Sequence, residues 1–169
     1  GAGDMRLANH AALQGFTVSA GFSIVMVVTG VFMTVPLMRL LGVGDEVIDT
    51  AATYLRIQFV GTGTMAFRQT SGAALQAAGD AITPMKATLL TRSAHLVLTP
   101  FLIFGWLWFP EMGIAGAALA DVLAQGLGAF WNFSVLFRGN SRLQLTLHGY
   151  YPDFRMMRRL VRIGLPASV

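Results

Sequence analysis

The sequence predicts an all-α protein, a polytopic bundle of about four membrane-spanning helices, and three observations support this class. Charged residues make up 12% of the 169 residues, about half the share found in an ordinary soluble domain. Hydrophobic residues make up 54%, and the mean hydropathy is +0.61. The run from residue 7 to residue 38 contains no Asp, Glu, Lys or Arg, and it exceeds the roughly 20 residues that a spanning helix needs. These features argue against a disordered chain and against a soluble domain.

The uncharged run predicts the first span, with a polar cap near Asp4 or Asn9 and an end at Gly42. The acidic pair Asp45 and Glu46 follows the turn. This pair suits the first turn of a second helix, because carboxylates are stabilised near the positive end of a helix dipole.

The second predicted helix covers residues 47–78 and is too polar to face lipid on all sides. Gly61, Gly63 and Gly72 are small residues that let helices approach closely. The long polar residues of this helix are Arg56, Gln58, Arg68, Gln69 and Gln76. We therefore expect this helix in the interior of the bundle.

Two further spans are predicted to form a hairpin. The third covers about residues 84–108, after a turn at Gly79 and Asp80. Trp106 and Trp108 fit an aromatic belt at the membrane interface. The fourth span covers residues 114–137 and follows a tight turn at residues 110–113.

A polar loop follows at residues 138–152, and residues 153–163 predict an amphipathic helix. At about 100° per residue, the arginines of this helix share one narrow arc. They are Arg155, Arg158, Arg159 and Arg162. Such a helix suits a membrane surface with anionic lipid under its arginines. The alternative is a solvated face that leads into a further span, and the two interpretations are compatible.

A net charge of +4 and a pI of about 10.3 would suggest a nucleic-acid partner in a soluble chain. With four spans, however, residues 1–10, 78–86 and 138–162 share one side and carry eight basic residues, whereas the opposite loops carry only Arg39. The positive-inside rule assigns the first set to the cytoplasm. We therefore expect an integral, multi-pass protein of the plasma (inner) membrane, with the lipid bilayer and no nucleic acid as partner.

Catalytic and metal-binding patterns are missing from the sequence. The chain has no cysteine, which excludes disulfides, thiolate nucleophiles and Cys-ligated zinc. No glycine-rich phosphate loop or metal-ligand spacing is present, so we expect no enzyme, no cofactor and no metal site. The chain begins with Gly1, and residues 164–169 resemble the opening of another apolar helix. We expect an internal fragment of a longer chain.

Four ionisable residues lie well inside the predicted spans: Arg68, Arg92, His95 and Asp121. Ionisable groups at such depth are rare, usually face the bundle interior and are often functional. Counting residues from a hairpin apex at Phe109 places His95 and Asp121 within about 3 Å of each other in depth.

The same counting places Arg92 level with Gln125. Helical spacing puts Thr99 on the face of Arg92 and His95, and puts Gln125 on the face of Asp121. Either the His95/Asp121 pair accepts a proton and senses which side of the membrane is open, or it is a static pair that satisfies buried polar groups.

Arg68 has no obvious partner among the four spans, so we expect it to face a water-filled cavity or a helix outside the fragment. The candidates for binding a substrate or a coupling ion are Arg92, His95, Thr99, Asp121, Gln125, Arg68 and Gln69.

Several stretches resemble the multidrug and toxic compound extrusion (MATE) family of transporters. Residues 75–85, LQAAGDAITPM, resemble the family's LRAxGDTxTPM turn between its fourth and fifth helices. Residues 102–105, LIFG, with residues 109–120, FPEMGIAGAALA, resemble its hairpin between the fifth and sixth. GAGD at the start is similar to the loop that enters the third helix, and IGLP at residues 163–166 to the start of the seventh.

The resemblance implies that residues 1–137 form a partial N-terminal lobe holding helices three to six. Residues 138–162 would then form a cytoplasmic inter-lobe loop with a basic amphipathic helix, and residues 163–169 would begin a second lobe. The partner implied is the missing C-terminal lobe of the same chain. Transporters of this family export organic cations, drugs or metabolites in exchange for H⁺ or Na⁺ by rocking two lobes around a central cavity, a form of alternating access.

One departure from the family bears on mechanism. Many members carry Asn in the fifth helix and Asp four residues later, and aligning the LIFG motif places His95 and Thr99 at those positions. The usual carboxylate is therefore absent. The resemblance leaves two possibilities: either His95 and Asp121 substitute for it, or the coupling site lies in the other lobe.

Three alternatives to an antiporter remain. A flippase for lipid-linked precursors should have a cavity lined by many arginines, whereas only Arg68 and Arg92 are deep here. An intramembrane enzyme acting on a lipid phosphate would need a nucleophile, for which Thr99 is the nearby candidate. A structural membrane subunit should have no cavity and should pair all its deep charges.

Overall fold

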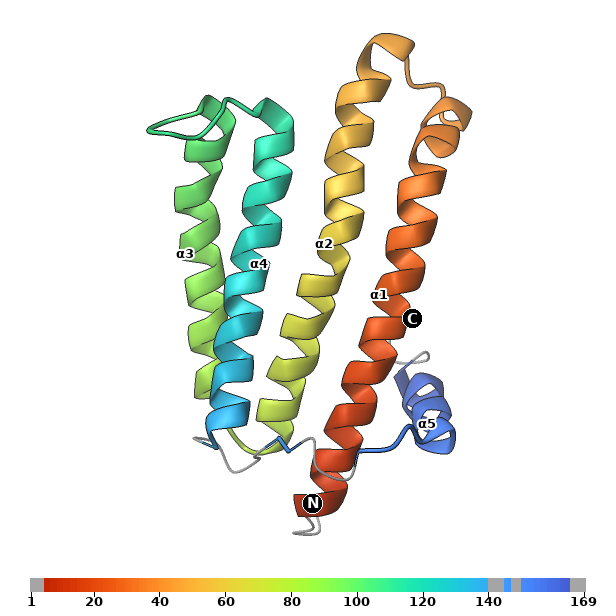
Figure 1. Ribbon diagram of the computed structural model, residues 1–169, viewed down its shortest axis with the longest axis vertical. Helices are drawn as coiled ribbons and strands as arrows, with labels where there is room; N and C mark the ends of the chain where they lie inside the picture. Colours follow the sequence, from red (N-terminus) through yellow and green to blue (C-terminus); the bar gives the residue numbers. More distant parts are fainter. Residues whose placement is uncertain (1–4, 140–144, 147–149, 165–169) are drawn as a thin grey trace.

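The computed structural model describes residues 5–139, 145–146 and 150–164, and all the regular secondary structure in these ranges is helical. Along the chain the helices are α1 (Met5–Leu40), α2 (Asp45–Ala77), α3 (Ile82–Phe104), α4 (Gly113–Arg138) and α5 (Phe154–Gly164). The four long helices lie side by side in the order α1, α2, α4, α3, and the short α5 lies beside α1 (Figure 1). The predicted all-α bundle is confirmed.

Helix α4 packs along both α2 and α3, whereas α2 and α3 contact each other at few positions. Small residues allow these close approaches. A Cβ atom added at Gly116 would lie 2.6 Å from the carbonyl carbon of Leu102, so α3 and α4 meet there backbone to backbone. A Cβ atom at Gly61 would lie 3.3 Å from that of Val122, which places the small residues predicted for the second helix against α4.

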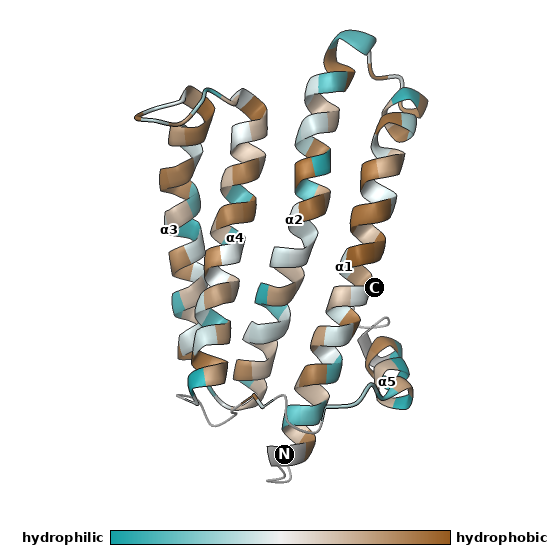
Figure 2. Ribbon diagram, in the orientation of Figure 1, coloured by the Kyte–Doolittle hydropathy of each residue, from teal (hydrophilic) through white to brown (hydrophobic). Residues whose placement is uncertain are grey.

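The long helices divide into two kinds by polarity. Leu7–Leu40, Ile82–Phe104 and Gly113–Arg138 are each long and apolar enough to cross a membrane. Within the described residues α2 is not among these helices, as its polar sequence predicts, and hydrophilic segments are spread along it in Figure 2. Large apolar side chains of the other helices are exposed, for example Phe32, Leu96 and Phe130, as expected of surfaces that face lipid.

Helix α3 ends at Phe104, four residues before the predicted end of the third span. Gly105 adopts the left-handed conformation with φ of +66°, which favours glycine and ends the helix. The backbone N–H of Trp106 then donates to the Phe101 carbonyl at 3.1 Å. Trp106 and Trp108 therefore lie in the loop that follows, where Trp108 is 96% exposed, a suitable place for interfacial tryptophans.

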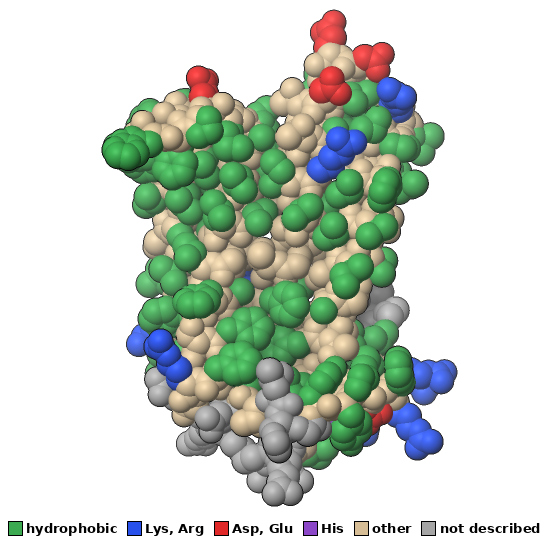
Figure 3. All heavy atoms as spheres, in the orientation of Figure 1, with side chains coloured by type: hydrophobic (Ala, Val, Ile, Leu, Met, Phe, Trp, Pro, Cys, Tyr) green, Lys and Arg blue, Asp and Glu red, His purple; other side chains and the backbone are tan. Residues whose placement is uncertain are grey.

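Acidic and basic side chains gather mainly at opposite ends of the bundle (Figure 3). Asp45 and Glu46 occupy the first turn of α2, as predicted. The arginines of α5 lie at the other end of the bundle (Figures 1 and 3). The structure thus has the charge polarity along the helix axes that the sequence indicates.

Candidate functional site

Arg68 lies on α2 and extends toward α4, where Gly128 leaves room for its side chain. A Cβ atom at position 128 would lie 2.8 Å from Arg68 Cδ and would also meet the Thr91 hydroxyl. Thr91 itself is buried and donates to the Ala87 carbonyl on its own helix. The glycine therefore admits an arginine side chain from α2 into the close contact that α4 makes with α2 and α3.

Three side chains from two helices form a hydrogen-bonded chain, which we call the inner network. Arg68 Nε donates to Gln125 Oε1 at 2.6 Å, and Gln125 Nε2 donates to Asp121 Oδ1 at 3.5 Å. Gln125 is only 7% exposed. The Gln125 amide therefore connects the Arg68 guanidinium to the Asp121 carboxylate, and no direct hydrogen bond or ion pair joins these two charged groups in the described residues.

Two further polar groups surround Arg68. Its Nη1 lies 3.5 Å from Thr88 Oγ1 on α3, and its backbone carbonyl accepts a 3.3 Å hydrogen bond from Asn132 Nδ2 on α4. Asn132 is 1% exposed, and its Oδ1 has no partner. Arg68 is therefore held by groups from all three helices, none of which is charged.

The charges in this part of the bundle do not cancel. Arg92 and Asp121 both interact electrostatically with Arg68, the first repelling and the second attracting its charge. Arg92 is exposed and makes no hydrogen bond or ion pair with the residues that the structure describes. Two cations thus lie near one carboxylate, which leaves an excess of positive charge in this part of the bundle.

The structure places Asp121 differently from the predicted pairing with His95. Within the described ranges no hydrogen bond or ion pair joins the two side chains. Asp121 instead contacts Gln125 on its own helix, one turn along. Counting residues gives the depth of a side chain but not its rotation about the helix axis, and the face of α4 that holds Gln125 is turned toward α2.

The remaining candidates on α3 form a local pair. Thr99 Oγ1 donates to the His95 carbonyl at 2.6 Å, so the threonine bonds to its own helix. His95 is half-buried. These two residues share a face, as predicted, but among the described residues neither contacts the inner network.

The expectation that Arg68 lacks a partner among these helices is wrong, because Gln125 supplies one. The expectation that Arg68 faces a cavity agrees with the structure, since it lines an open cavity of about 210 Å³ between α2, α3 and α4. This cavity lies where α2 and α3 separate. Its lining residues are Arg68, Gln69, Gly72, Ala73, Gln76, Pro84, Thr88 and Asn132.

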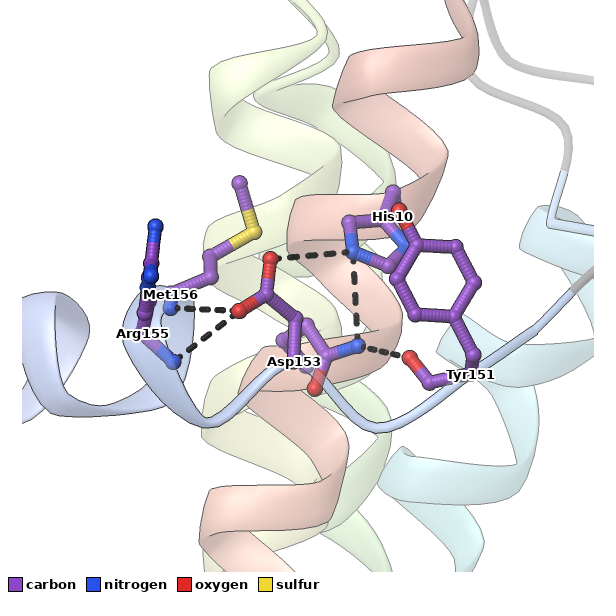
Figure 4. A network of polar contacts seen from close by, with 6 residues as sticks. His10, Tyr151, Asp153, Arg155 and Met156 are labelled. Atoms are coloured by element: carbon purple, nitrogen blue, oxygen red, sulfur yellow. Dashed lines mark hydrogen bonds and ion pairs between the residues drawn. The ribbon is translucent and has the colours of Figure 1, made fainter.

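A second cluster, the linker network, joins the segment before α5 to the start of α1 (Figure 4). His10 Nε2 lies 3.9 Å from Asp153 Oδ2, and the His10 and Tyr151 rings are 4.7 Å apart. Gln14 Nε2 donates to the Tyr151 carbonyl at 2.6 Å. Asp153 Oδ1 also accepts from the backbone N–H groups of the first turn of α5, at 2.9 and 3.1 Å.

The sequence gives little sign of the linker network, because its members are more than 130 residues apart. His10 looks like an isolated end residue in the sequence, and the structure shows that it is not. The one local signal was Asp153, an acidic residue directly before an amphipathic helix, which is typical of an N-terminal cap. No group of three or more His, Cys, Asp or Glu that could hold a metal ion occurs in the described part of the chain.

Spanning helices that hold an uncompensated polar cluster beside a cavity define the class of membrane transport proteins. The comparisons with known proteins give the family. The MatE family model matches residues 1–101, and the chain belongs to this family. The resemblance read from the sequence motifs is thereby confirmed.

The first two relatives are named as probable multidrug resistance proteins. The probable multidrug resistance protein YoeA of Bacillus subtilis is 30% identical over 164 residues, which cover 94% of this chain and 35% of YoeA. The probable multidrug resistance protein NorM of Thermotoga maritima is 32% identical over 124 residues, covering 73% of this chain and 26% of NorM. The chain thus spans about a third of the length of the curated relatives it matches.

Solved structures agree with the fold. An inward-facing MATE family multidrug resistance transporter superposes with a TM-score of 0.87 at 25% identity, covering 98% of this chain and 37% of that one. An outward-facing conformation superposes with a TM-score of 0.84, covering 95% and 35% at 24% identity. The fold of this chain is therefore found in both of these solved structures.

Proposed function

We propose that the chain forms part of the N-terminal lobe of a secondary active antiporter. The whole protein would export organic cations, drugs or metabolites in exchange for H⁺ or Na⁺, by alternating access between two lobes. Residues 138–162 would link the lobes on the cytoplasmic side of the plasma (inner) membrane, and residues 163–169 would begin the second lobe. The coupling ion would be the only ligand besides the substrate, with no resident cofactor.

The observation that carries this proposal is the inner network. A carboxylate and an arginine joined through an amide within a membrane-protein bundle are costly to bury, and ionisable groups at such depth usually serve a function. The names of the relatives support the same conclusion, since they include multidrug resistance proteins, a multidrug export protein and a FAD transporter.

Asp121 is the leading candidate for the coupling group. It is the carboxylate of the inner network, and it bonds only to a neutral amide at 3.5 Å. It can therefore gain or lose a proton, or take up Na⁺, without breaking an ion pair. His95 is a second candidate, because histidine is a common proton acceptor in proteins and this one lies on the neighbouring helix.

The test is transport by the full-length protein in proteoliposomes, with proton and sodium gradients imposed separately and a fluorescent organic cation as the cargo. Asp121→Asn should reduce gradient-driven efflux by about tenfold or more, because the ion-binding charge is removed. Glu111→Gln is the matched control, since Glu111 is exposed in the α3–α4 loop. Unchanged efflux in Asp121→Asn and in His95→Gln, with normal expression, would remove the coupling role from this lobe.

A second candidate function is a flippase for lipid-linked precursors. The excess of positive charge from Arg68 and Arg92 favours it, because phosphate groups bind arginine well. Absence of gradient-driven efflux for every organic cation tested, combined with translocation of a lipid-linked phosphate, would support this candidate against the antiporter.

A further inference from the structure

The cavity beside Arg68 has the properties of a site for a negatively charged ligand. It opens where α2 and α3 separate, and α4 forms its floor through Asn132. Thr88, Gln69 and Gln76 supply further polar groups on its wall. No carboxylate lines this cavity in the described part of the chain.

The protein satisfies only part of the hydrogen-bonding capacity of the Arg68 guanidinium. Its Nε is committed to Gln125 at 2.6 Å, and its Nη1 reaches Thr88 at the distance limit of a hydrogen bond. Its Nη2 has no partner among the described residues. An arginine fixed at Nε presents its two terminal nitrogens as a pair, which is the geometry that binds two oxygens of a carboxylate or a phosphate.

Asn132 gives a second, independent indication of a ligand. Its side chain is 1% exposed, it lines the cavity, and its Oδ1 has no protein partner. The assignment of the amide is fixed, because turning it over would place Oδ1 instead of Nδ2 at 3.3 Å from the Arg68 carbonyl. A buried acceptor without a donor costs free energy, so the hydrogen bonding beside the cavity is incomplete at Asn132.

We propose that this cavity binds an anionic group, a carboxylate or a phosphate, of the molecule that the transporter carries. The proposal rests on the transport function proposed above and narrows its substrates to molecules that carry an anionic group. Arg68 contacts the anion, Gln125 orients the guanidinium, and Arg92 adds long-range attraction. The position of Arg68, nine residues before the end of α2 on the side of α5, suits loading from the side where the basic residues gather.

The test measures binding of carboxyfluorescein, an anionic dye, to the full-length protein in nanodiscs of phosphatidylcholine. The wild type should bind the dye saturably, and inorganic phosphate should compete. Arg68→Gln should weaken binding by about tenfold or more, because a charge-assisted pair of hydrogen bonds is lost. Arg56→Gln is the matched control, since Arg56 is an exposed arginine of the same helix that does not line the cavity.

A pair of variants at Gln69 keeps the test independent of the folding of the Arg68 variant. Gln69 is exposed and lines the cavity, so Gln69→Glu should weaken dye binding through repulsion while Gln69→Lys should preserve or strengthen it. Equal binding by Gln69→Glu and Gln69→Lys would overturn the proposal. So would binding by a folded Arg68→Gln variant at wild-type affinity.

Two further arms separate the origin of the anion and the proposed transport function. Competition by phosphatidylglycerol in the nanodisc, with none by inorganic phosphate, would identify a lipid headgroup as the ligand of the same anion site. Efflux of a cationic dye driven by an ion gradient, with no Arg68-dependent binding of carboxyfluorescein, would overturn the anion site and leave the antiporter standing. Arg68-dependent binding of carboxyfluorescein, with no gradient-driven efflux of either the cationic dye or carboxyfluorescein, would leave the anion site standing and overturn the antiporter.

Discussion

The inner network and the linker network use similar side chains but differ in how their charges are paired. In the inner network Arg68 bonds to the neutral Gln125, and the nearest carboxylate, Asp121, bonds to the same amide. In the linker network Asp153 caps α5 with one oxygen and faces His10 with the other (Figure 4). In the inner network Arg68 keeps hydrogen-bond donors available for a ligand. In the linker network both oxygens of the Asp153 carboxylate interact with groups of the chain itself.

The difference teaches how to separate function from packing in a helical membrane bundle. A polar group that merely holds helices together should find its partners within the structure, as Asp153 does. A polar group that serves a ligand keeps part of its bonding capacity unused, as Arg68 does at its terminal nitrogens. The four predictions below test this distinction.

Helices α3 and α4 meet backbone to backbone at Gly116, so the most severe change should be Gly116→Ala. The new Cβ would lie 2.6 Å from the Leu102 carbonyl carbon, and backbone cannot move aside as a side chain can. We expect a loss of about 3 kcal/mol or more, at the upper end for overpacked sites, measured as unfolding of the full-length protein in detergent.

Gly126→Ala is the matched control on the same helix. Its Cβ would have only one neighbour, Thr64 Cγ2 at 3.9 Å, and alanine is the better helix former by about 1 kcal/mol. Gly126→Ala should therefore be neutral or stabilising. Equal stability of the two variants would contradict the close contact at Gly116 on which the geometry of the cavity depends.

Gln125→Leu should have the next largest effect, because it removes the amide that joins Arg68 to Asp121. The charged Nε of Arg68 would lose its acceptor, which costs about 2 kcal/mol for a hydrogen bond to a charged group. Transport should fall as well, since the guanidinium is no longer oriented. Gln125→Glu keeps an acceptor at the same place and should restore most of the stability; if Gln125→Leu matches the wild type in both stability and transport, the inner network is not functional.

The helices and their polarity were predictable from sequence, whereas the contacts of the inner network were not. Long uncharged runs and glycine turns predict where the spans begin and end. The largest deviation is at α3, which ends a few residues before the predicted end of the third span. Depth arithmetic predicts where Asp121 lies along α4, but it could not give the rotation that turns Gln125 toward Arg68. The contacts of His10 depend on a loop that returns to α1, and no local pattern encodes that return.

Gln14→Leu tests the linker network with the same substitution. Gln14 is 0% exposed and donates one hydrogen bond to the Tyr151 carbonyl. Because both groups are neutral, the expected loss is smaller, about 1 kcal/mol. Hydrogen exchange in residues 150–164 should accelerate while transport stays at the wild-type rate. Loss of transport without faster exchange would show that the linker network, too, is functional.

The smallest effect should come from Asp80, which lies outside the membrane-spanning segments in the α2–α3 turn. Its Oδ1 accepts from the N–H groups of Ile82 and Thr83 at 3.1 and 2.9 Å, and its Oδ2 accepts from the Thr83 hydroxyl at 2.6 Å. The hydrogen bond from the Thr83 side chain, followed by that from its backbone, holds the pKa of Asp80 below its ordinary value of 3.8. Both carboxylate oxygens of Asp80 thus accept hydrogen bonds from the start of α3. Asp80 caps α3 in the same way that Asp153 caps α5.

Because the pKa is depressed in the folded state, the stabilisation is present above the ordinary pKa and is lost as the pH falls through the folded value. Asp80→Asn should therefore cost about 0.5 kcal/mol at neutral pH, a cap reduced by its exposure to solvent. The difference from the wild type should begin to shrink below the ordinary pKa and should vanish below the depressed pKa of the folded state. Asp49→Asn is the matched control, at an exposed aspartate whose carboxylate makes no hydrogen bond with the described residues, and it should show no such pH dependence. If the stability difference between Asp80→Asn and the wild type persists in acid, the asparagine destabilises the turn for steric reasons and not through loss of charge.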